Sequence, residues 1–250
     1  TKLQAKGRIQ NLPNIDKTVF DLQIPHFTSG RRDLEKILPD SLIPADIKLP
    51  EQLSLSGNFK GSVQDFKSKV DFQSSYGGLA LNAEMKMPAD SIPRYTASAK
   101  LKNFDLGQLL NQPDTIGKLS LTADVSGKSL DWETMEAQIH ANIDSASYQG
   151  YPYRDLKMNA TIDHQLVQAE ASMKDTNVVF DFKAEVNTSS DTMRYKANLD
   201  LEGVDLQALH FADEDIRAKG QLKVDFSGDN LNNLNGKADL RNVLFIQNNQ

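Results

Sequence analysis

The sequence predicts a mainly β protein: an elongated, curled antiparallel sheet, a U-shaped trough or half-barrel built from repeats, with a few short helical turns. Three observations support this fold class. Apolar and polar residues alternate along many segments, which is typical of antiparallel strands with one apolar and one polar face. Turn-forming stretches such as "SYGG" and "NTSSDT" separate these segments. A 17-residue stretch beginning at Arg94 recurs, with substitutions, 100 residues later at Arg194.

The first predicted strands lie between residues 52 and 87. The segment "EQLSLSGNFKG" places Leu53, Leu55 and Phe59 on one face and polar residues on the other. Shorter alternations follow around residues 70–72 and 79–87. Because each segment alternates with a period of two, we expect antiparallel strands.

The later strands show the same period more strongly. In "KLSLTADVSG", Leu119, Leu121 and Val125 share a face, and in "GQLKVDFSG" the same holds for Leu222, Val224 and Phe226. Three predicted strands have their last apolar residue two positions before a glycine, at Gly61, Gly127 and Gly228. Further alternating runs are expected as strands at 135–143, 156–162, 167–173 and 178–186.

Helical signal is slight. The segments 105–110 ("DLGQLL") and 205–210 ("DLQALH") begin with an aspartate suited to capping and space their leucines three apart, enough for one or two turns. The segment 31–39 ("RRDLEKILP") is the third member, in which Asp33, Leu34 and Ile37 match Asp105, Leu106 and Leu109. The proline-rich stretch 39–52 is expected to be a stiff connector rather than a strand.

The repeat predicts three modules in one continuous sheet. We expect a divergent first module at 1–94, a second module at 95–194 and the truncated start of a third at 195–250. The alternative is a duplicated compact sandwich. Against it, we find no second set of strands with large apolar side chains that could cover the first set.

Composition limits the function classes. With 250 residues the chain can bury a substantial core. The net charge of −6, with Lys and Asp intermixed, argues against a nucleic-acid or polybasic membrane surface. The absence of cysteine excludes disulfides, thiol catalysis and cysteine zinc sites. No apolar run approaches the roughly 20 residues that span a bilayer. We expect a piece of a longer protein, with any targeting or anchoring segment outside it.

The histidines show no ligand-like spacing. They are His26, His140, His164 and His210. His140 stands on the polar face of its predicted strand, where a solvated imidazole is expected. The motif "SGKS" at 126–129 is not a phosphate-binding loop, because the required glycine is replaced by Thr122 within a strand.

No other constellation meets the requirements of a catalytic site. The acidic run 213–215 is expected to be a solvated helix end, since the regular ligand alternation of a calcium loop is missing. Trp132, the only tryptophan, is expected to be a partly exposed loop residue. We therefore predict no catalytic residue, no metal and no cofactor, and a protein that is not an enzyme.

One short motif, Asp-(Ser/Thr)-apolar, occurs more often than composition explains. Asp and Ser favour turns, so turn chemistry is one interpretation. The other is that it resembles the O-glycosylation acceptor of some Gram-negative periplasmic proteins. The candidate acceptors are Ser41, Ser91, Thr115, Ser145 and Thr192.

Residues 105–186 resemble a repeat of the AsmA/TamB superfamily. The resemblance lies in four features in order: the Asp-Leu-x-x-Leu turn, a glycine-initiated strand ending in Ser-Gly, the tyrosine-rich turn "YQGYPYRDL" and the strand "DTNVVFDF". It covers most of 95–250 well and the first 90 residues loosely.

This resemblance implies a curled sheet with an apolar interior. Such proteins are typically anchored in the inner membrane by an N-terminal helix and cross the periplasm. They are implicated in moving phospholipid toward the outer membrane, and in some instances in outer-membrane protein assembly. The resemblance thus implies a periplasmic part of an inner-membrane-anchored protein of a Gram-negative bacterium.

Two functional hypotheses follow. In the first, an apolar trough carries phospholipid or another acyl-chain lipid, because exposing a 16-carbon tail to water costs about 12 kcal/mol at about 0.8 kcal/mol per methylene. In the second, a non-catalytic scaffold or assembly factor for outer-membrane proteins pairs its sheet edges with strands of a partner, such as an outer-membrane assembly protein. The side chains expected to line the trough are Leu53, Leu55, Phe59, Leu119, Leu121, Val125, Ile139, Ile143, Phe180, Phe182, Leu222, Val224 and Phe226.

Overall fold

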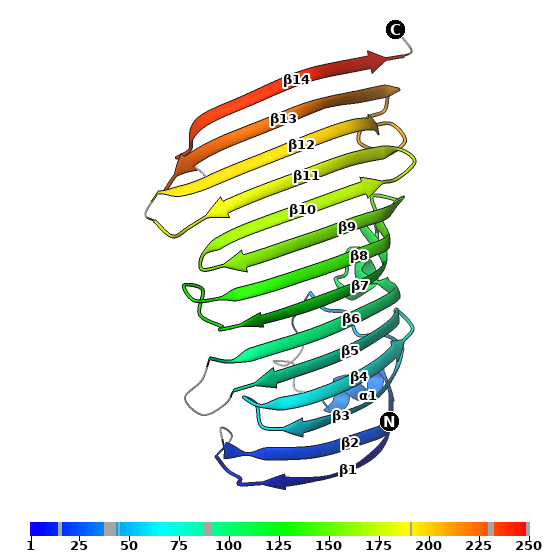
Figure 1. The fold of residues 1–250 in the computed structure, drawn as a ribbon. Coiled ribbons are helices and arrows are strands. Elements are labelled where there is room, and N and C mark those ends of the chain that lie inside the picture. Colours follow the sequence, from blue (N-terminus) through cyan, green and yellow to red (C-terminus); the bar gives the residue numbers. More distant parts are fainter. Residues whose placement is uncertain are drawn as a thin grey trace. The chain divides into compact units, whose positions relative to one another are not determined.

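The computed structural model describes residues 1–14, 17–37, 44, 46–87, 92–190, 192–229 and 233–248. In this part of the chain, strands dominate and only two short helices occur (Figure 1). The helices are α1 (Arg31–Ile37) and α2 (Leu106–Leu109). The strands are β1 (Lys2–Gln10), β2 (Val19–Gly30), β3 (Gln52–Gly61), β4 (Phe66–Ser74), β5 (Gly77–Lys86), β6 (Arg94–Asp105), β7 (Ile116–Lys128), β8 (Glu136–Tyr148), β9 (Tyr151–Asp163), β10 (Leu166–Lys174), β11 (Val178–Asn187), β12 (Met193–Asp205), β13 (Ile216–Gly228) and β14 (Asn235–Gln247).

The strands form one 14-stranded sheet whose order is the order of the sequence. Every strand pair with a described register is antiparallel. The sheet is open, because β1 and β14 stand at the two ends of this order. The prediction of a mainly β, open and curled antiparallel sheet is confirmed.

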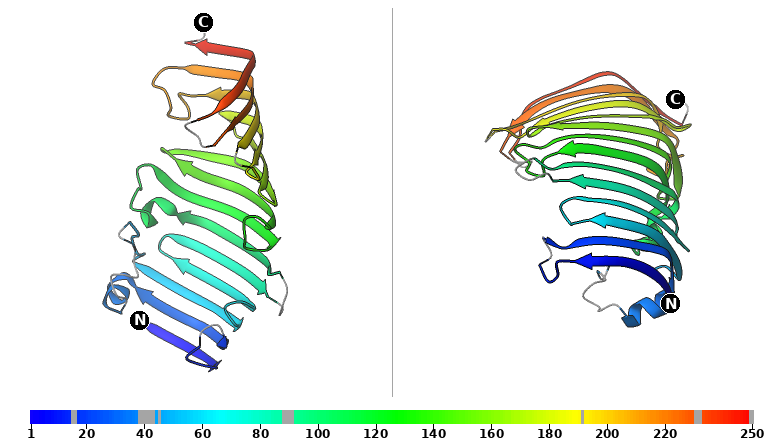
Figure 2. Two further views of the ribbon diagram at one scale, coloured as in Figure 1. Left: turned by 90° about the vertical axis from the view of Figure 1, so that its left-hand side faces the viewer. Right: turned by 60° about the horizontal axis from the view of Figure 1, so that its bottom comes forward.

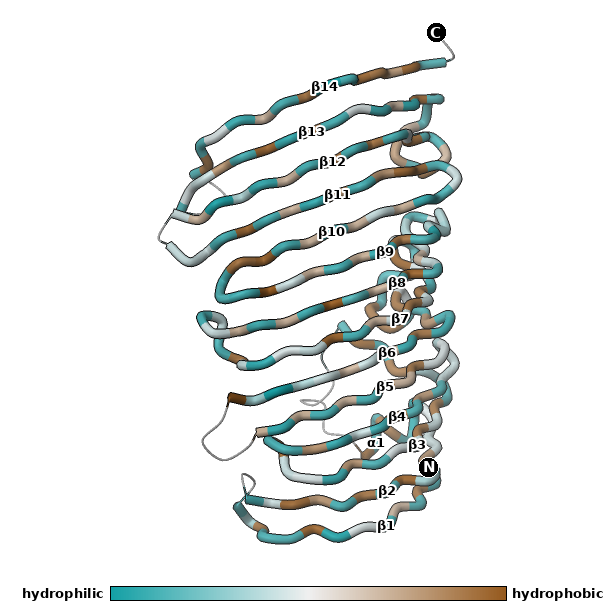
Figure 3. The backbone as a smooth tube through the Cα atoms, viewed as in Figure 1, coloured by the Kyte–Doolittle hydropathy of each residue, from teal (hydrophilic) through white to brown (hydrophobic). Residues whose placement is uncertain are grey.

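The chain divides into two compact units, Thr1–Ser126 and Gly127–Gln250, which we call unit 1 and unit 2. The boundary falls near the end of β7. Within each unit the strands bend along their length (Figure 2). Hydropathy changes from residue to residue along much of the strands (Figure 3). Because successive side chains of a strand point to opposite faces, such alternation gives one apolar and one polar face.

The 100-residue repeat is visible in the element boundaries. β6 ends at Asp105 and β7 spans Ile116–Lys128, while β12 ends at Asp205 and β13 spans Ile216–Gly228. The side chain of Asp105 accepts a hydrogen bond from the backbone N–H of Gln108 at 2.9 Å. Asp205 accepts the equivalent bond from Ala208, also at 2.9 Å. Both aspartates therefore cap the turn that leaves their strand, as the sequence predicts.

The predicted helical segments differ from one another in the structure. Residues 106–109 form α2, but the segment 206–210 forms hydrogen-bonded turns instead of a helix. In α1, Asp33 lies inside the helix and not before it, and Ile37 is 63% exposed. The match of Asp33 to the capping aspartates is therefore wrong. The part of the 39–52 connector that the structure describes contains no strand before Gln52.

Two of the strand-ending glycines are required by close backbone approach. Gly61 has a φ of +125°, and a Cβ there would lie 2.0 Å from the carbonyl oxygen of Asp65. At Gly228 a Cβ would lie 1.9 Å from the carbonyl oxygen of Asn233. The chain doubles back tightly at both sites, so only glycine fits. Among the described residues, no helix has the length and apolar character needed to cross a membrane.

Candidate functional site

The apolar face of unit 2 is the strongest candidate site, because its side chains align across seven strands. One row, taken from the strand registers, runs Ala141, Met158, Ala171, Phe182, Leu199, Leu222 and Leu240. The row on one side runs Ile139, Ala160, Ala169, Ala184, Ala197, Val224 and Ala238. The third row, beyond the second, runs Ala137, Ile162, Val167, Val186, Tyr195, Phe226 and Gly236, so the row that begins at Ile139 is the middle one. We call these three rows the apolar face.

The middle row of the apolar face consists largely of alanine, and the rows on both sides carry larger side chains. Adjacent strands are about 4.8 Å apart, so seven strands extend these rows over roughly 29 Å. Small side chains between larger ones leave room above the sheet, whereas a filled core would need larger residues.

Unit 1 carries the same kind of face. One row runs Leu3, Phe27, Leu55, Phe72, Leu79 and Leu101 across β1 to β6. Aromatic side chains contact one another on neighbouring strands of this unit. The rings of Phe59 and Phe66 are stacked with centroids 5.0 Å apart, and Phe20 meets Phe59 edge to face at 5.9 Å.

All thirteen predicted lining residues are half-buried: none is buried and none is fully exposed. Leu53, Leu55 and Phe59 lie in β3, and Leu119, Leu121 and Val125 in β7. The other seven lie in β8, β11 and β13 of unit 2. Half-burial depends on the face and not only on the residue type, because Ser68 on the apolar side of β4 is half-buried while its neighbours Lys67 and Lys69 are exposed. The apolar side of the sheet is therefore the more sheltered one.

Full burial in unit 2 occurs mainly at one end of the strands. Leu209 is only 2% exposed and packs with Met173 and Val178 at the ends of β10 and β11. The segment 206–211, which we call the cap, also reaches the β8–β9 turn, where His210 Nδ1 lies 2.7 Å from the carbonyl oxygen of Gln149. The cap thus closes one margin of the apolar face and leaves the rows beyond it uncovered in the described structure.

A polar cluster supports this margin. The Tyr151 hydroxyl donates a short hydrogen bond to the carboxylate of Asp175, which is 6% exposed. The backbone N–H groups of Arg154 and Asn177 donate to the same carboxylate at 3.0 and 2.9 Å. Burial and then Asp175 raise the pKa of Tyr151 above its usual range. The tyrosine-rich turn is therefore a structural anchor for the cap.

The matching margin of unit 1 is closed by other residues. Tyr76 is 8% exposed, and its hydroxyl donates to the carbonyl oxygen of Leu49 at 3.2 Å. Arg31 Nε donates to the same carbonyl at 2.6 Å, and Arg31 Nη1 pairs with Glu51 at 2.9 Å. The backbone N–H of Lys48 donates to Leu109 of α2 at 2.8 Å. The connector and both helices are thus bound to this margin.

The opposite margin of unit 2 carries the β7–β8 loop. Trp132 in this loop is 43% exposed, and its Nε1 donates to Thr188 Oγ1 at 3.1 Å. The prediction of a partly exposed loop tryptophan is confirmed. Ala137, beside the loop, is 6% exposed. In the apolar row that begins at Ala137, this first residue is therefore the one that the margin buries.

The opposite face of the sheet carries charged pairs between neighbouring strands. In unit 2, Lys183 pairs with Glu170 at 2.7 Å and Lys196 with Glu185 at 3.3 Å. Gln168 first, and then Lys196, lower the pKa of Glu185 by hydrogen bonding to its carboxylate. In unit 1, Lys86 and Lys67 lower the pKa of Glu84 in the same way. This face is suited to water, and exposed pairs of this kind contribute little stability.

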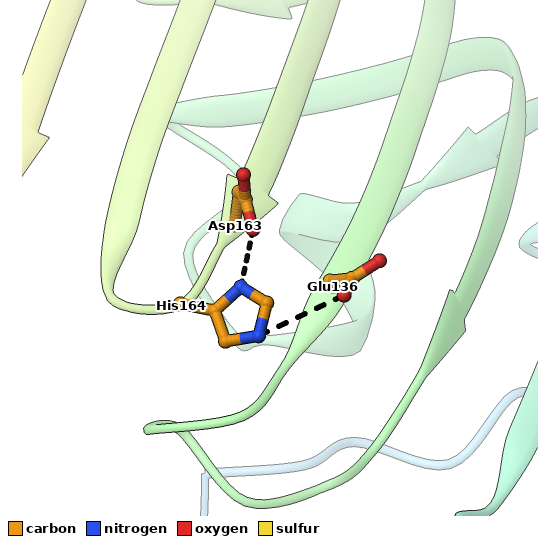
Figure 4. A group of neighbouring side chains, drawn as sticks. All are labelled: Glu136, Asp163 and His164. Carbon is orange, nitrogen blue, oxygen red and sulfur yellow. Dashed lines mark hydrogen bonds and ion pairs between the residues drawn. The ribbon is translucent and has the colours of Figure 1, made fainter.

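Sequence spacing missed one group that the β8–β9 register brings together: Glu136, Asp163 and His164 (Figure 4). His164 Nδ1 makes a short contact with the Asp163 carboxylate, and His164 Nε2 lies 3.7 Å from Glu136 Oε1. Lys128 Nζ is 2.8 Å from the same Glu136 oxygen. Because a lysine already neutralises Glu136 and all three side chains are at least partly exposed, the group is an ordinary surface network.

The structure also places His140 and three of the candidate O-glycosylation acceptors. His140 is exposed on the polar face, with Nδ1 2.7 Å from Asn159 Oδ1. Thr115 and Thr192 are exposed in turns, where an enzyme could reach them, whereas Ser145 is half-buried and paired within β8. Ser41 and Ser91 lie outside the described residues.

Comparison with known proteins gives no relative: no family model, no curated protein and no solved structure matches the chain.

Proposed function

We propose that the chain is a periplasmic segment of an AsmA/TamB-like protein and that its apolar face carries phospholipid between the inner and outer membranes. The observation that carries this proposal is the set of three apolar rows in unit 2, in register across β8–β14 and mostly only half-buried. A sheet face of this kind, without a covering layer in the described structure, favours an apolar occupant.

The energetics suit a conduit without chemistry. Sheltering a 16-carbon tail recovers most of the roughly 12 kcal/mol that exposure to water costs. The polar face keeps the segment soluble at the same time, since it carries the exposed ion pairs. We infer that transport requires no catalytic side chain and that a membrane anchor belongs to another part of the protein.

The proposal predicts that a charge on the apolar face stops transfer. Phe182→Glu places a carboxylate between Ala171 and Leu199, in the row that begins at Ala141. Contact of this carboxylate with an acyl chain costs well over 1.4 kcal/mol, so transfer of fluorescent phospholipid between vesicles is expected to fall at least about tenfold.

Asn198→Glu is the matched control. Asn198 is exposed on the polar face and lies opposite Lys183 and Lys223, which accommodate a carboxylate. This variant should transfer lipid at the rate of the unaltered chain. Circular dichroism and urea midpoints establish that both variants fold. Full transfer by folded Phe182→Glu would contradict the conduit.

Native mass spectrometry separates the two functional classes. Phospholipid that co-purifies with the chain supports the conduit. Lipid-free protein in a stable complex with another protein would instead support a scaffold that acts through sheet-edge pairing.

A further inference from the structure

The polar face of unit 1 carries more basic than acidic side chains. Strands β3–β6 contain seven basic and three acidic residues, whereas β10–β13 of unit 2 contain seven of each. The intermixing of Lys and Asp along the sequence hides this local excess, which becomes visible only when the strands are aligned. We call the seven basic residues of these strands, which share one face, the basic face: Lys60, Lys67, Lys69, Lys86, Arg94, Lys100 and Lys102.

The register brings like charges together on the basic face. Lys60 of β3 stands directly opposite Lys67 of β4, and Lys69 lies two residues further along β4 on the same face. Lys86 of β5 stands directly opposite Arg94 of β6. Like charges in directly opposite positions destabilise a sheet, so these pairs carry a cost that an anionic ligand would remove.

Few carboxylates neutralise the basic face. Glu84 is shared by two of its lysines, with Lys67 and Lys86 each 3.1 Å away. All seven basic side chains are exposed. Four of them form no ion pair in the part of the chain that the structure describes: Lys60, Lys69, Lys100 and Lys102. The basic face therefore presents a net positive charge to its surroundings.

The 100-residue repeat shows that this charge is not required by the fold. Lys100 and Lys102 of β6 correspond to Asp200 and Glu202 of β12. All four side chains are exposed. Equivalent positions of two equivalent strands thus accept either sign of charge, and the lysines of β6 are not needed to form the sheet.

The other residues of these strands indicate which partner fits. The aromatic side chains lie on the apolar side, as Phe59, Phe72 and Tyr95 do, and the lysines are separated mainly by small polar residues. Protein interfaces are rich in aromatic residues and depleted in lysine, and single-stranded nucleic acids bind by stacking on aromatic rings. Six of the seven basic residues are lysines, which act as point charges and not as paired donors. Such a surface is suited to a layer of anionic head groups.

We propose that the basic face of unit 1 docks on a membrane that contains anionic phospholipid. Each lysine close to such a membrane strengthens binding about fivefold. The basic face lies on the opposite side of the sheet from the apolar side chains, so docking leaves those side chains free. The inference does not depend on the lipid conduit, because it requires charges on the polar face and no site for an acyl chain.

Vesicle flotation tests the proposal. The chain is mixed with vesicles of phosphatidylcholine and phosphatidylglycerol in equal parts, and separately with vesicles of phosphatidylcholine alone. We expect binding to the anionic vesicles to be at least about tenfold tighter and to weaken as salt is added. Lys100→Asp combined with Lys102→Glu introduces the residues that the repeat carries at these positions, so the sheet should still form. This double variant should bind the anionic vesicles at least about tenfold more weakly than the unaltered chain.

A matched control changes the net charge by the same amount in unit 2. Lys157 and Lys223 are exposed on the polar face, and neither forms an ion pair within the described residues. Lys157→Asp combined with Lys223→Glu should bind the anionic vesicles as tightly as the unaltered chain. Circular dichroism and urea midpoints establish that the variants fold. A neutral pair, Lys100→Gln with Lys102→Gln, should show a smaller loss of binding than the acidic pair.

Three outcomes would overturn the proposal. Equal losses in the two acidic double variants would show that net charge, and not the basic face, controls binding. Equal binding to the two kinds of vesicle, or binding to neither, would show that anionic head groups are not recognised. Binding to DNA or to polyglutamate without binding to the anionic vesicles would assign the basic face to a different polyanion.

Discussion

Two tyrosines at the capped margin of unit 2 differ sharply in how their hydroxyl groups are satisfied. The rings of Tyr151 and Tyr153 pack edge to face with centroids 4.8 Å apart. The Tyr151 hydroxyl donates to Asp175 and accepts from Asn177 Nδ2 at 3.1 Å. The Tyr153 hydroxyl is buried without a hydrogen-bond partner in the described structure. An unpaired buried hydroxyl costs about 1–3 kcal/mol, so the two residues affect stability in opposite directions.

We therefore predict opposite effects from the same substitution. Tyr153→Phe should raise the free energy of unfolding by about 1 kcal/mol, because it removes the unpaired hydroxyl. Tyr151→Phe should lower it by about 1–3 kcal/mol, because the buried Asp175 carboxylate loses a donor. Urea unfolding followed by fluorescence of Trp132, the only tryptophan, measures both. Equal losses in the two variants would contradict this account of the margin.

At the scale of elements, the turns that leave β6 and β12 depend on their capping aspartates. Asp105 and Asp205 each accept one backbone N–H that would otherwise lack a partner. Asp205 also contacts Arg217 Nε at 3.2 Å, but this pair is exposed and of little weight.

Asp105→Ala and Asp205→Ala should each lower the free energy of unfolding by about 1 kcal/mol. Asp105→Ser and Asp205→Ser keep an acceptor oxygen and should recover most of the loss. Urea midpoints of the four variants test this prediction by comparing the alanine variant with the serine variant at each position. Alanine variants as stable as the serine variants would show that the turns hold without a cap.

Much of the element level could be predicted from the sequence. Alternation located most of the strands from β3 onward and showed which side chains share a face, because the period of a strand is two. It did not locate β1 and β2, which lie before the first predicted strand. The repeat located the capped turns at 105 and 205. The predicted match of residues 31–37 to the capped turns at 105 and 205 is wrong. Asp33 lies within α1 and Ile37 projects into solvent, so the residues have the same spacing as in the two turns but pack differently.

The margins could not be predicted in the same way. Asp155 has a φ of +55°, and the β8–β9 pairing skips this position, so Tyr153 and Leu156 fall on one face although they are three residues apart. The cap contacts also join residues distant in sequence, such as Leu209 and Met173. The alanine row was overlooked as a unit because small residues give a weak pattern until register aligns them.

At the scale of the whole molecule, each unit combines a sheltered apolar face with an ion-paired polar face and one closed margin. Apolar rows in register would normally bury themselves against a second layer. In the described residues of unit 2 full burial of apolar side chains is confined to Ala137, Met173, Val178 and Leu209, and the rows between the margins remain half-exposed. Our account assigns this free surface to acyl chains.

The most direct test places a photoreactive amino acid on each face of the same strand. Leu199 lies in the apolar row that begins at Ala141, between Phe182 and Leu222, and Asn198 next to it is exposed on the polar face. After irradiation of cells that contain the full protein, mass spectrometry should find phospholipid attached at position 199 and none at position 198. Equal labelling at the two positions, or none at 199 in a folded protein, would contradict the claim that the apolar face holds lipid.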